Sequence, residues 1–313
     1  MAYPFPVIAI LGPTASGKSE VAQKVALELE GEVVSADSMQ IYRSMDIGTA
    51  KLLPSERLVP HHLIDILDPG DAFSAQQFQQ LSRKAFIDIE QRNKIPVLCG
   101  GTGLYVQASL EDMRFPKGDQ KHNPVREKYE LMAKEQGNQA VWDVLHELDP
   151  ESASLLHVNN VRRVIRALEM HEQGVSYAEQ VKHMKHLPEV VPSLRFGLQR
   201  DPALLAKRIN DRVDSMIEHG LIEEVNHLLQ QGFRDALTAP QAIGYKEIVS
   251  YLDGTISLEE AVEQIKTATR RYAKRQRTWL RRDFRLTMLD ADTLTIGQIV
   301  DVICDSYRKT STL

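Results

Sequence analysis

The fold is decided by the stretch Gly12-Pro13-Thr14-Ala15-Ser16-Gly17-Lys18-Ser19, which matches G-x-x-x-x-G-K-[ST], the pattern of a phosphate-binding P-loop. A buried-strand pattern, Val7 to Leu11, precedes this loop, and a helical pattern, Ser19 to Leu29, follows it. A strand before the loop and a helix after it are the context that the motif requires. A glycine-rich turn that binds nothing is the alternative. The context favours a cradle for a di- or triphosphate, formed by all eight residues.

The residue types of this loop suit a polyphosphate. Glycines let consecutive backbone N–H groups point inward, and the N-terminus of the following helix adds partial positive charge. Lys18 can neutralise phosphate, and the hydroxyl of Ser19 can bind Mg2+. We therefore expect Mg2+ as the cofactor, with Ser19 as its protein ligand.

Strand patterns alternate with helical patterns in the first hundred residues. Glu32 to Ala36 and Ile95 to Cys99 are typical of buried strands. Between them, Ser74 to Gln91 has helical spacing with an apolar face of Phe78, Leu81, Ala85 and Ile89. This alternation predicts an α/β fold with a parallel sheet of the P-loop NTPase type. Ligands of such sheets bind beyond the carboxyl ends of the strands, where this chain has polar and glycine-rich loops.

The pattern changes after about Phe115. The next residues that break regular structure are Pro116, Gly118, Asn123 and Pro124. From there to about Gly174 the chain is helical without a convincing strand, and amphipathic helices resume from Pro202. We expect a P-loop core of residues 1–114 and 198–313, interrupted by a helical insertion domain of residues 115–197.

Composition narrows the possible environments of the protein. The 313 residues are 42% hydrophobic and 26% charged, as in a globular protein. The N-terminus has no basic region, and its apolar run stops at Gly12, so we expect neither secretion nor a membrane partner. Cys99 and Cys304 lie far apart and form no disulfide framework or zinc motif, which favours the cytoplasm. A net charge of -5 argues against indiscriminate coating of nucleic acid.

Positive charge is nevertheless concentrated near the C-terminus. Between Lys266 and Arg285 the chain has nine Lys or Arg and one acid, Asp283. Helical spacing places four of the basic residues on one face, namely Arg270, Lys274, Arg277 and Arg281. A solvated basic helix is one interpretation, and binding to a phosphate backbone is the better one in an otherwise acidic chain. For Arg162, Arg163 and Arg166, surface arginines and RNA contacts remain equally open.

Several further stretches, in order along residues 8–282, carry a family resemblance. They are Ser35–Tyr42, Met45–Lys51, Gly100–Tyr105, Arg163 with Arg166–Glu169, Ala242–Glu247 and Thr269–Trp279. With the P-loop, they resemble the bacterial tRNA dimethylallyltransferases of the IPP transferase family. Two residues depart from the usual pattern, because Ser19 stands where many members have threonine and Arg162 where glutamine is common. The absence of a C-terminal zinc finger favours the bacterial type.

This resemblance implies a function and a set of partners. The enzyme would transfer a dimethylallyl group from dimethylallyl diphosphate to N6 of the adenine 3′ of the tRNA anticodon, releasing diphosphate. It would act as a monomer on tRNA. An ATP-dependent small-molecule or nucleoside kinase is the alternative, and a non-catalytic RNA-binding module is a third class. The third class would require the loops of Asp37 and Thr102 to be incidental.

The resemblance also implies the site. The catalytic residues would be Asp37, Thr14, Lys18, Thr102 and Arg212, with Asp37 as the general base for the adenine amine. A capping or turn aspartate is the alternative for Asp37. The implied tRNA contacts are Asp37, Ser38, Met39, Gln40, Thr102, Arg126, Arg162, Arg163, Val164, Ile165, Arg166, Gly244, Tyr245, Lys246, Arg270, Lys274, Arg277 and Arg281.

Overall fold

A computed structural model describes residues 5–115, 123–184, 187–236 and 238–311. The chain divides into two compact units, which we describe separately. The first unit comprises Met1–Leu110 and Val190–Leu313, and the second comprises Glu111–Glu189. The insertion therefore begins and ends earlier than the 115–197 expected from sequence. Among the described residues, no helix combines the length and apolar character needed to cross a membrane.

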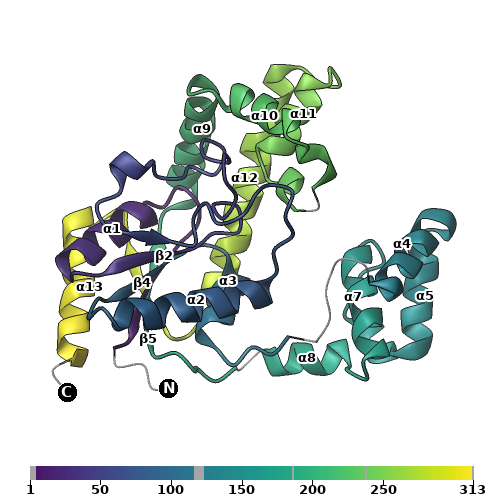
Figure 1. Ribbon diagram of the computed structural model, residues 1–313, viewed down its shortest axis with the longest axis horizontal. Helices are drawn as coiled ribbons and strands as arrows, with labels where there is room; N and C mark the ends of the chain where they lie inside the picture. Colours follow the sequence, from purple (N-terminus) through teal and green to yellow (C-terminus); the bar gives the residue numbers. More distant parts are fainter. Residues whose placement is uncertain (1–4, 116–122, 185–186, 237, 312–313) are drawn as a thin grey trace. The chain divides into compact units, whose positions relative to one another are not determined.

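The first unit is built on a six-stranded sheet in which every strand pairing is parallel (Figure 1). The strands lie in the order β3-β2-β4-β1-β5-β6. Their bounds are β1 Val7–Leu11, β2 Glu32–Ala36, β3 His61–His62, β4 Pro96–Gly100, β5 Ser193–Gln199 and β6 Leu286–Asp290. The predicted α/β class and parallel sheet are confirmed. β1 and β2 match the predicted ranges, and β4 begins one residue later than predicted.

Strand β5 pairs with β1, although the domain boundary expected from sequence placed residues 193–197, most of this strand, in the insertion. Two residues interrupt the apolar pattern by which a buried strand is recognised. Arg195 carries a charge, and its side chain is 1% exposed because Nη1 forms a 2.7 Å ion pair with Asp283 Oδ2. Gly197 interrupts the apolar run because a Cβ atom there would clash with Leu286 and Met288 of β6. Both residues are explained only by contacts made far along the chain.

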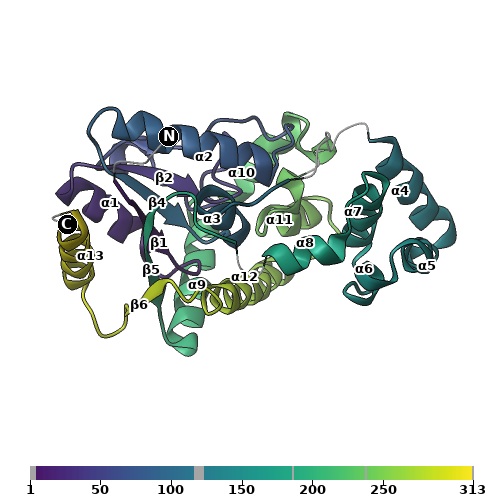
Figure 2. The ribbon, with the colours of Figure 1, turned by 90° about the horizontal axis from the view of Figure 1, so that it is seen from below.

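Helices cover both faces of the sheet (Figure 2). Their bounds are α1 Lys18–Glu28, α2 Ala75–Glu90, α3 Gly103–Leu110, α9 Pro202–Glu218, α10 Leu221–Gln230, α11 Tyr245–Leu252, α12 Leu258–Leu280 and α13 Ile296–Ser311. Ile8 and Ile10 of β1 pack in a core with α1 and α13, whereas Val7 and Leu11 pack in a core with α2 and α3. Such burial on two faces explains why all five residues of β1 are buried.

The predicted helix before β4 is confirmed as α2, which begins after Ser74. The Ser74 hydroxyl accepts a hydrogen bond from the backbone N–H of Gln77, which caps the helix N-terminus. One member of the predicted apolar face is wrong, because Leu81 is 38% exposed. Phe86 is buried in the stripe instead.

A third core supports the loop that follows β2. Ile41, Tyr42 and Met45 of this loop are fully buried among residues of α9, α10, α11 and α12. The loop belongs to the predicted site because it begins at Asp37. Its backbone is therefore fixed by four helices that lie much later in the sequence.

The second unit is helical, as predicted. Its helices are α4 Pro124–Gln136, α5 Asn138–Leu148, α6 Pro150–Ser154, α7 Val161–Glu172 and α8 Tyr177–His183. Asn123 caps α4, with its Oδ1 accepting from the backbone N–H of Val125, and Pro124 is the first helical residue. Two other expected breakers, Pro116 and Gly118, lie outside the described residues.

Candidate active site

The P-loop lies between β1 and α1, so its predicted context of strand, loop and helix is confirmed. Its backbone has two residues in the left-handed region, Ala15 with φ of 62° and Gly17 with φ of 95°. Gly17 immediately precedes Lys18, the first residue of α1. A turn of this kind directs backbone N–H groups toward one centre, which is the geometry of an anion nest.

Two cations face the interior of the site. Lys18 Nζ donates a 3.3 Å hydrogen bond to the carbonyl of Pro13, and Arg212 Nη2 donates a 3.4 Å bond to the carbonyl of Thr49. Neither forms an ion pair within the described part of the chain. Burial lowers the pKa of Lys18 and of Arg212 below their ordinary values, and the charge of Asp37 opposes both shifts. Two half-buried cations without a paired carboxylate form a site for an anionic ligand.

Asp37 follows the last residue of β2 and lines the same cleft as Thr14, Lys18 and Arg212. Its Oδ1 accepts a 2.9 Å hydrogen bond from the backbone N–H of Met39. The turn role considered for this aspartate is therefore real, and it uses one oxygen. Oδ2 has no hydrogen-bond partner among the described residues and remains able to accept a proton.

The cleft has a volume of about 290 Å³ and a mixed lining. Its polar residues include Thr14, Lys18, Asp37, Ser38 and Arg212. Its apolar residues include Met39, Ile209, Val213, Met216, Ile243 and Ile265. A lining with both charged groups and hydrocarbon suits a ligand that has an anionic and an apolar part.

The glycine-rich loop after β4 is shaped by α12. A Cβ atom at Gly101 would clash with Nε2 of Gln276, and one at Gly103 would clash with the indole of Trp279. The glycines therefore let the loop approach the helix closely. Between them, the hydroxyl of Thr102 is buried, and it acts on the pKa of Tyr272 through a side-chain hydrogen bond. Thr102 is not part of the described lining of the cleft.

Gln276 is a site residue that sequence reasoning did not select. Its Oε1 accepts a 2.9 Å hydrogen bond from the backbone N–H of Thr14, and its Nε2 donates a 3.0 Å bond to the carbonyl of Gly101. It thereby joins the P-loop to the glycine-rich loop. Tyr272 also lines the cleft, and burial, with a contribution from the charge of Asp37, raises its pKa to about 12. Both residues lie within a stretch that was read mainly for its positive charge.

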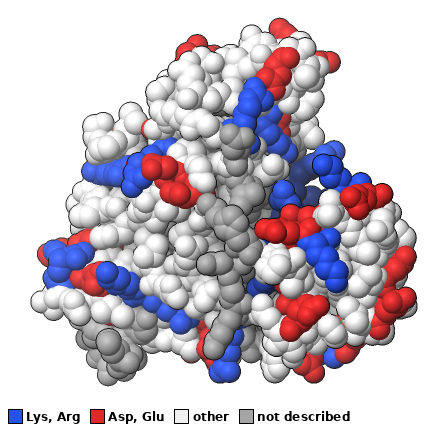
Figure 3. All heavy atoms as spheres, turned by 45° about the vertical axis from the view of Figure 1, so that its right-hand side comes forward, with Lys and Arg blue, Asp and Glu red and all other residues white. Residues whose placement is uncertain are grey.

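The predicted basic face exists. Arg270, Lys274, Arg277 and Arg281 line one groove between α9 and α12, with a volume of about 370 Å³. Arg270 is held in place, because Nη1 donates to Asn210 Oδ1 at 2.6 Å and Nη2 to Thr267 Oγ1 at 2.9 Å. The other three form no ion pair with any described acidic side chain. Figure 3 shows basic and acidic side chains interspersed on one face of the molecule.

The four arginines of the helical unit that were predicted to contact tRNA fall into two pairs. Arg126 Nε and Arg166 Nη1 contact the two oxygens of Glu169 at 2.7 and 2.8 Å, and the Glu169 side chain is 1% exposed. Arg162 and Arg163 are exposed and form no ion pair in the described part of this unit. The intervening Val164 and Ile165 are buried in the core of the unit, so their side chains offer no surface to RNA.

The segment Gly244–Lys246 presents little side-chain surface. Tyr245 is 0% exposed, and its hydroxyl donates a 2.6 Å hydrogen bond to Glu224 Oε1. A contact of the Tyr245 side chain with tRNA is therefore not supported. Lys246 is half exposed, with its Nζ 3.5 Å from Glu247 Oε1, and Gly244 lines the cleft. This segment can therefore offer a ligand its backbone groups and the side chain of Lys246.

Comparisons with known proteins identify relatives along nearly the whole chain. Residues 40–283 match the family described as IPP transferase, and residues 5–59 match a family described as isopentenyl transferase. The tRNA dimethylallyltransferase of Carboxydothermus hydrogenoformans is 48% identical over 303 residues, covering 95% of this chain and 96% of that protein. That of Bacillus cytotoxicus is 49% identical over 290 residues, covering 91% and 90%.

Solved structures give the same answer. The tRNA delta(2)-isopentenylpyrophosphate transferase of Staphylococcus epidermidis is 39% identical, with a TM-score of 0.72 over 97% of this chain and 99% of that chain. A eukaryotic dimethylallyltransferase acting on tRNA is 29% identical, with a TM-score of 0.80 over 97% of this chain and 80% of that chain. The chain therefore belongs to the IPP transferase family, whose tRNA dimethylallyltransferases are prenyl-transferring enzymes.

Proposed function

We propose that this protein transfers the dimethylallyl group of dimethylallyl diphosphate to N6 of the adenine 3′ of the tRNA anticodon and releases diphosphate. One observation carries the proposal: two half-buried cations, a carboxylate and several apolar side chains all line one cleft. The cations suit the diphosphate, the apolar side chains suit the five-carbon chain, and the carboxylate suits the proton of the amine. Family membership also sets aside the kinase and the non-catalytic RNA-binding module.

The P-loop would hold the leaving group. Negative charge grows on the bridging oxygen as the C–O bond to the dimethylallyl carbon breaks. Lys18 and Arg212, both without carboxylate partners in the described chain, would stabilise that charge. The hydroxyl of Thr14, which lines the same cleft, would add a hydrogen bond.

Ser19 would hold Mg2+ beside the diphosphate. Its hydroxyl oxygen is a ligand of the kind that Mg2+ prefers, and it lines a cavity with Lys18 and Asp37. Bound there, the ion would supply further positive charge to the departing diphosphate. The residues present thus fit the expected cofactor.

Asp37 would complete the exchange. The exocyclic amine of adenine is a weak nucleophile because its lone pair is delocalised into the ring. As the N6–C bond forms, the amine proton becomes acidic, and Oδ2 of Asp37 would accept it. One C–O bond breaks, one N–C bond forms, the proton passes to Asp37 and diphosphate leaves, so the step is balanced.

The adenine must leave its stack to reach this cleft. Unstacking costs a few kcal/mol and is easier in an anticodon loop than in a duplex. Thr102 and Gln40 would contact the extruded base or its backbone. Phosphates of the tRNA would meet the groove between α9 and α12, with Arg162 and Arg163 as candidates in the helical unit. We further propose that the enzyme acts as a monomer in the cytoplasm, where both free cysteines would stay reduced.

One incubation tests the proposed function. Purified protein is mixed with tRNA and either labelled dimethylallyl diphosphate or ATP labelled at its terminal phosphate. We expect label from the diphosphate in tRNA, recovered after digestion as an adenosine alkylated at N6. Transfer of labelled phosphate to a nucleoside would instead support the kinase. Binding of tRNA without transfer from either donor would support the non-catalytic module.

The basic groove makes a separate prediction. Replacing Lys274, Arg277 or Arg281 by Ala should weaken tRNA binding and reduce the slope of log affinity against log salt by about 0.7 to 0.9 each. The change at Arg270 should be smaller, because Asn210 and Thr267 hold its guanidinium. Transfer to tRNA that is already bound should survive in each variant.

The matched control for this prediction is Arg271→Ala. Arg271 is exposed on the same helix but does not line the groove, so its loss should leave the salt slope nearly unchanged. If the Lys274, Arg277 and Arg281 variants fold normally and keep the parental slope, tRNA binds elsewhere.

A further inference from the structure

Three consecutive backbone N–H groups beside the site donate hydrogen bonds to one carboxylate. The N–H groups of Asp46 and Ile47 donate to Oε2 of Glu224 at 2.9 and 2.7 Å, and that of Gly48 donates to Oε1 at 3.2 Å. Glu224 belongs to α10, far from this loop in sequence. Hydrogen bonds from several amides to an ionised carboxylate are stronger than those to a neutral acceptor, so this contact fixes the loop backbone.

The neighbours of Glu224 complete this clamp. The hydroxyl of Tyr245 donates a 2.6 Å hydrogen bond to Oε1, so both carboxylate oxygens have two donors. Burial and the negative charge of Glu224 hold the pKa of Tyr245 well above its usual range, so the phenol keeps its proton and remains a donor. Gly48 lies against the same ring, where a Cβ atom would clash. The clamp explains why the loop has glycine here and why the tyrosine is buried.

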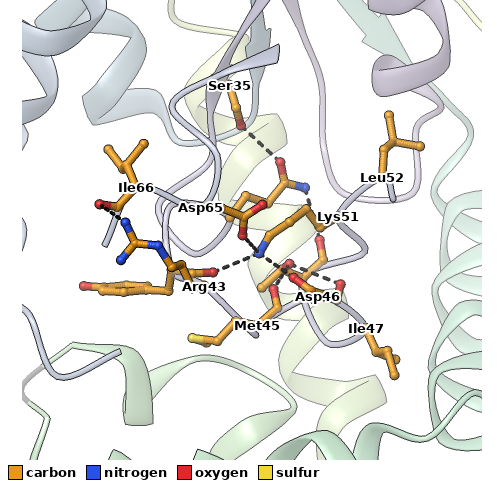
Figure 4. A network of polar contacts seen from close by, with 12 residues as sticks. Ser35, Arg43, Met45, Asp46, Ile47, Lys51, Leu52, Asp65 and Ile66 are labelled. Carbon is orange, nitrogen blue, oxygen red and sulfur yellow. Dashed lines mark hydrogen bonds and ion pairs between the residues drawn. The ribbon is translucent and has the colours of Figure 1, made fainter. Parts of the chain in front are cut away.

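The opposite side of the loop is held by a buried lysine (Figure 4). Lys51 Nζ lies 2.5 Å from Asp46 Oδ1 and 2.5 Å from Asp65 Oδ1, and it donates a 2.8 Å hydrogen bond to the carbonyl of Tyr42. Its side chain is 3% exposed. The segment between residues 46 and 51 is therefore anchored at both ends.

The anchored segment contacts two site residues through one atom. The carbonyl oxygen of Thr49 accepts a 3.3 Å hydrogen bond from Gln40 Nε2 and a 3.4 Å hydrogen bond from Arg212 Nη2. Thr49 directly follows the three clamped amides. The position of this carbonyl, and with it the direction of both side chains, depends on where Glu224 holds the loop.

We propose that Glu224 is a positioning residue for prenyl transfer, an inference that rests on the proposed function. Glu224 does not belong to the described lining of the cleft and touches no reacting atom. It acts through the backbone of residues 46–48 and the Thr49 carbonyl, and it directs the Arg212 guanidinium toward the departing diphosphate. Its loss should therefore affect the chemical step and the use of dimethylallyl diphosphate, and leave the tRNA phosphate contacts intact.

The test compares Glu224→Ala with Glu224→Gln. Misplacement of a catalytic group by about 1 Å can cost about 100-fold in rate, so we expect Glu224→Ala to lower kcat/KM for dimethylallyl diphosphate by about 10- to 100-fold. The salt slope of tRNA binding should keep its parental value. Glu224→Gln should recover much of the rate, because its remaining oxygen can still accept from Asp46 and Ile47. If the Ala variant does not fold, the rate of the Gln variant is the measurement that tests the proposal.

Two controls separate positioning from general stability. Glu223→Ala removes the same charge from an exposed neighbour that contacts none of the three amides, and it should keep the parental kcat/KM. Ile303→Ala opens a cavity in the core beneath α13, which contains no residue of the clamped loop, and should lower the melting temperature without moving the Thr49 carbonyl. We expect it to keep the parental kcat/KM on the folded fraction.

The results distinguish two failures. Parental kcat/KM in folded Glu224→Ala, or an equal loss in Ile303→Ala, would overturn the positioning role alone. Absence of transfer from dimethylallyl diphosphate by the parental protein would overturn the proposed function itself.

Discussion

Replacing Asp37 by Ala should lower turnover by about 10² to 10⁴, the usual effect of losing a general base. Affinity for tRNA should stay within a few-fold of the parental value, because the phosphate contacts lie elsewhere. Single-turnover measurement of transfer to bound tRNA reports the chemical step directly. Unchanged turnover would exclude Asp37 as the base.

The structure also separates the two functions of this aspartate. Asp37→Asn keeps an oxygen for the backbone N–H of Met39 and so preserves the turn, but it removes the group that accepts a proton. If Asp37 acts as the base, the Asn variant should be nearly as slow as the Ala variant. If the residue only fixes the turn, the Asn variant should recover most of the parental rate.

The second large effect concerns the two cations. Lys18→Ala and Arg212→Ala should each lower kcat/KM for dimethylallyl diphosphate by about 10² to 10³, the cost of losing one group that stabilises charge in the transition state. Both should still bind tRNA. Lys207→Ala is the matched control, because Lys207 is an exposed cation on the same helix as Arg212 and lines no described part of the cleft.

The shape of the Arg212 guanidinium can be tested separately from its charge. Arg212→Lys keeps the charge but loses the fork-shaped geometry that reaches the Thr49 carbonyl. We expect it to recover only part of the lost rate. Parental rate and KM in Arg212→Ala would show that this position was wrongly assigned to the diphosphate.

Sequence reasoning succeeded where the signal is local. Residues 12–19 are adjacent, and the strand and helix that frame them have their own apolar patterns. Strands β1 and β2 were predicted for the same reason. Strand β5 was not, because the charge of the buried Arg195 is neutralised by Asp283, 88 residues later. A pattern read within one window cannot show that such a charge is neutralised.

The same limit applies to the site. Asp37 follows a strand end and Lys18 belongs to the P-loop motif, so both could be selected from sequence, whereas Arg212 came only from the family resemblance. Gln276 and Glu224 act through backbone groups 262 and 177 residues away. Neither has a distinctive neighbour in sequence, and a helical glutamine or glutamate is ordinarily a surface residue. Only the folded chain shows the amides that they hold.

The close approach of α12 to the glycine-rich loop also restricts how this family can vary. Position 101 has no space for a side chain because the amide of Gln276 occupies it, and position 103 is covered by the indole of Trp279. A larger residue at either place requires a simultaneous change on the helix. Positions 101 and 276, like positions 103 and 279, should therefore be inherited as pairs, and a chimera that exchanges α12 between distant relatives must carry the matching loop with it.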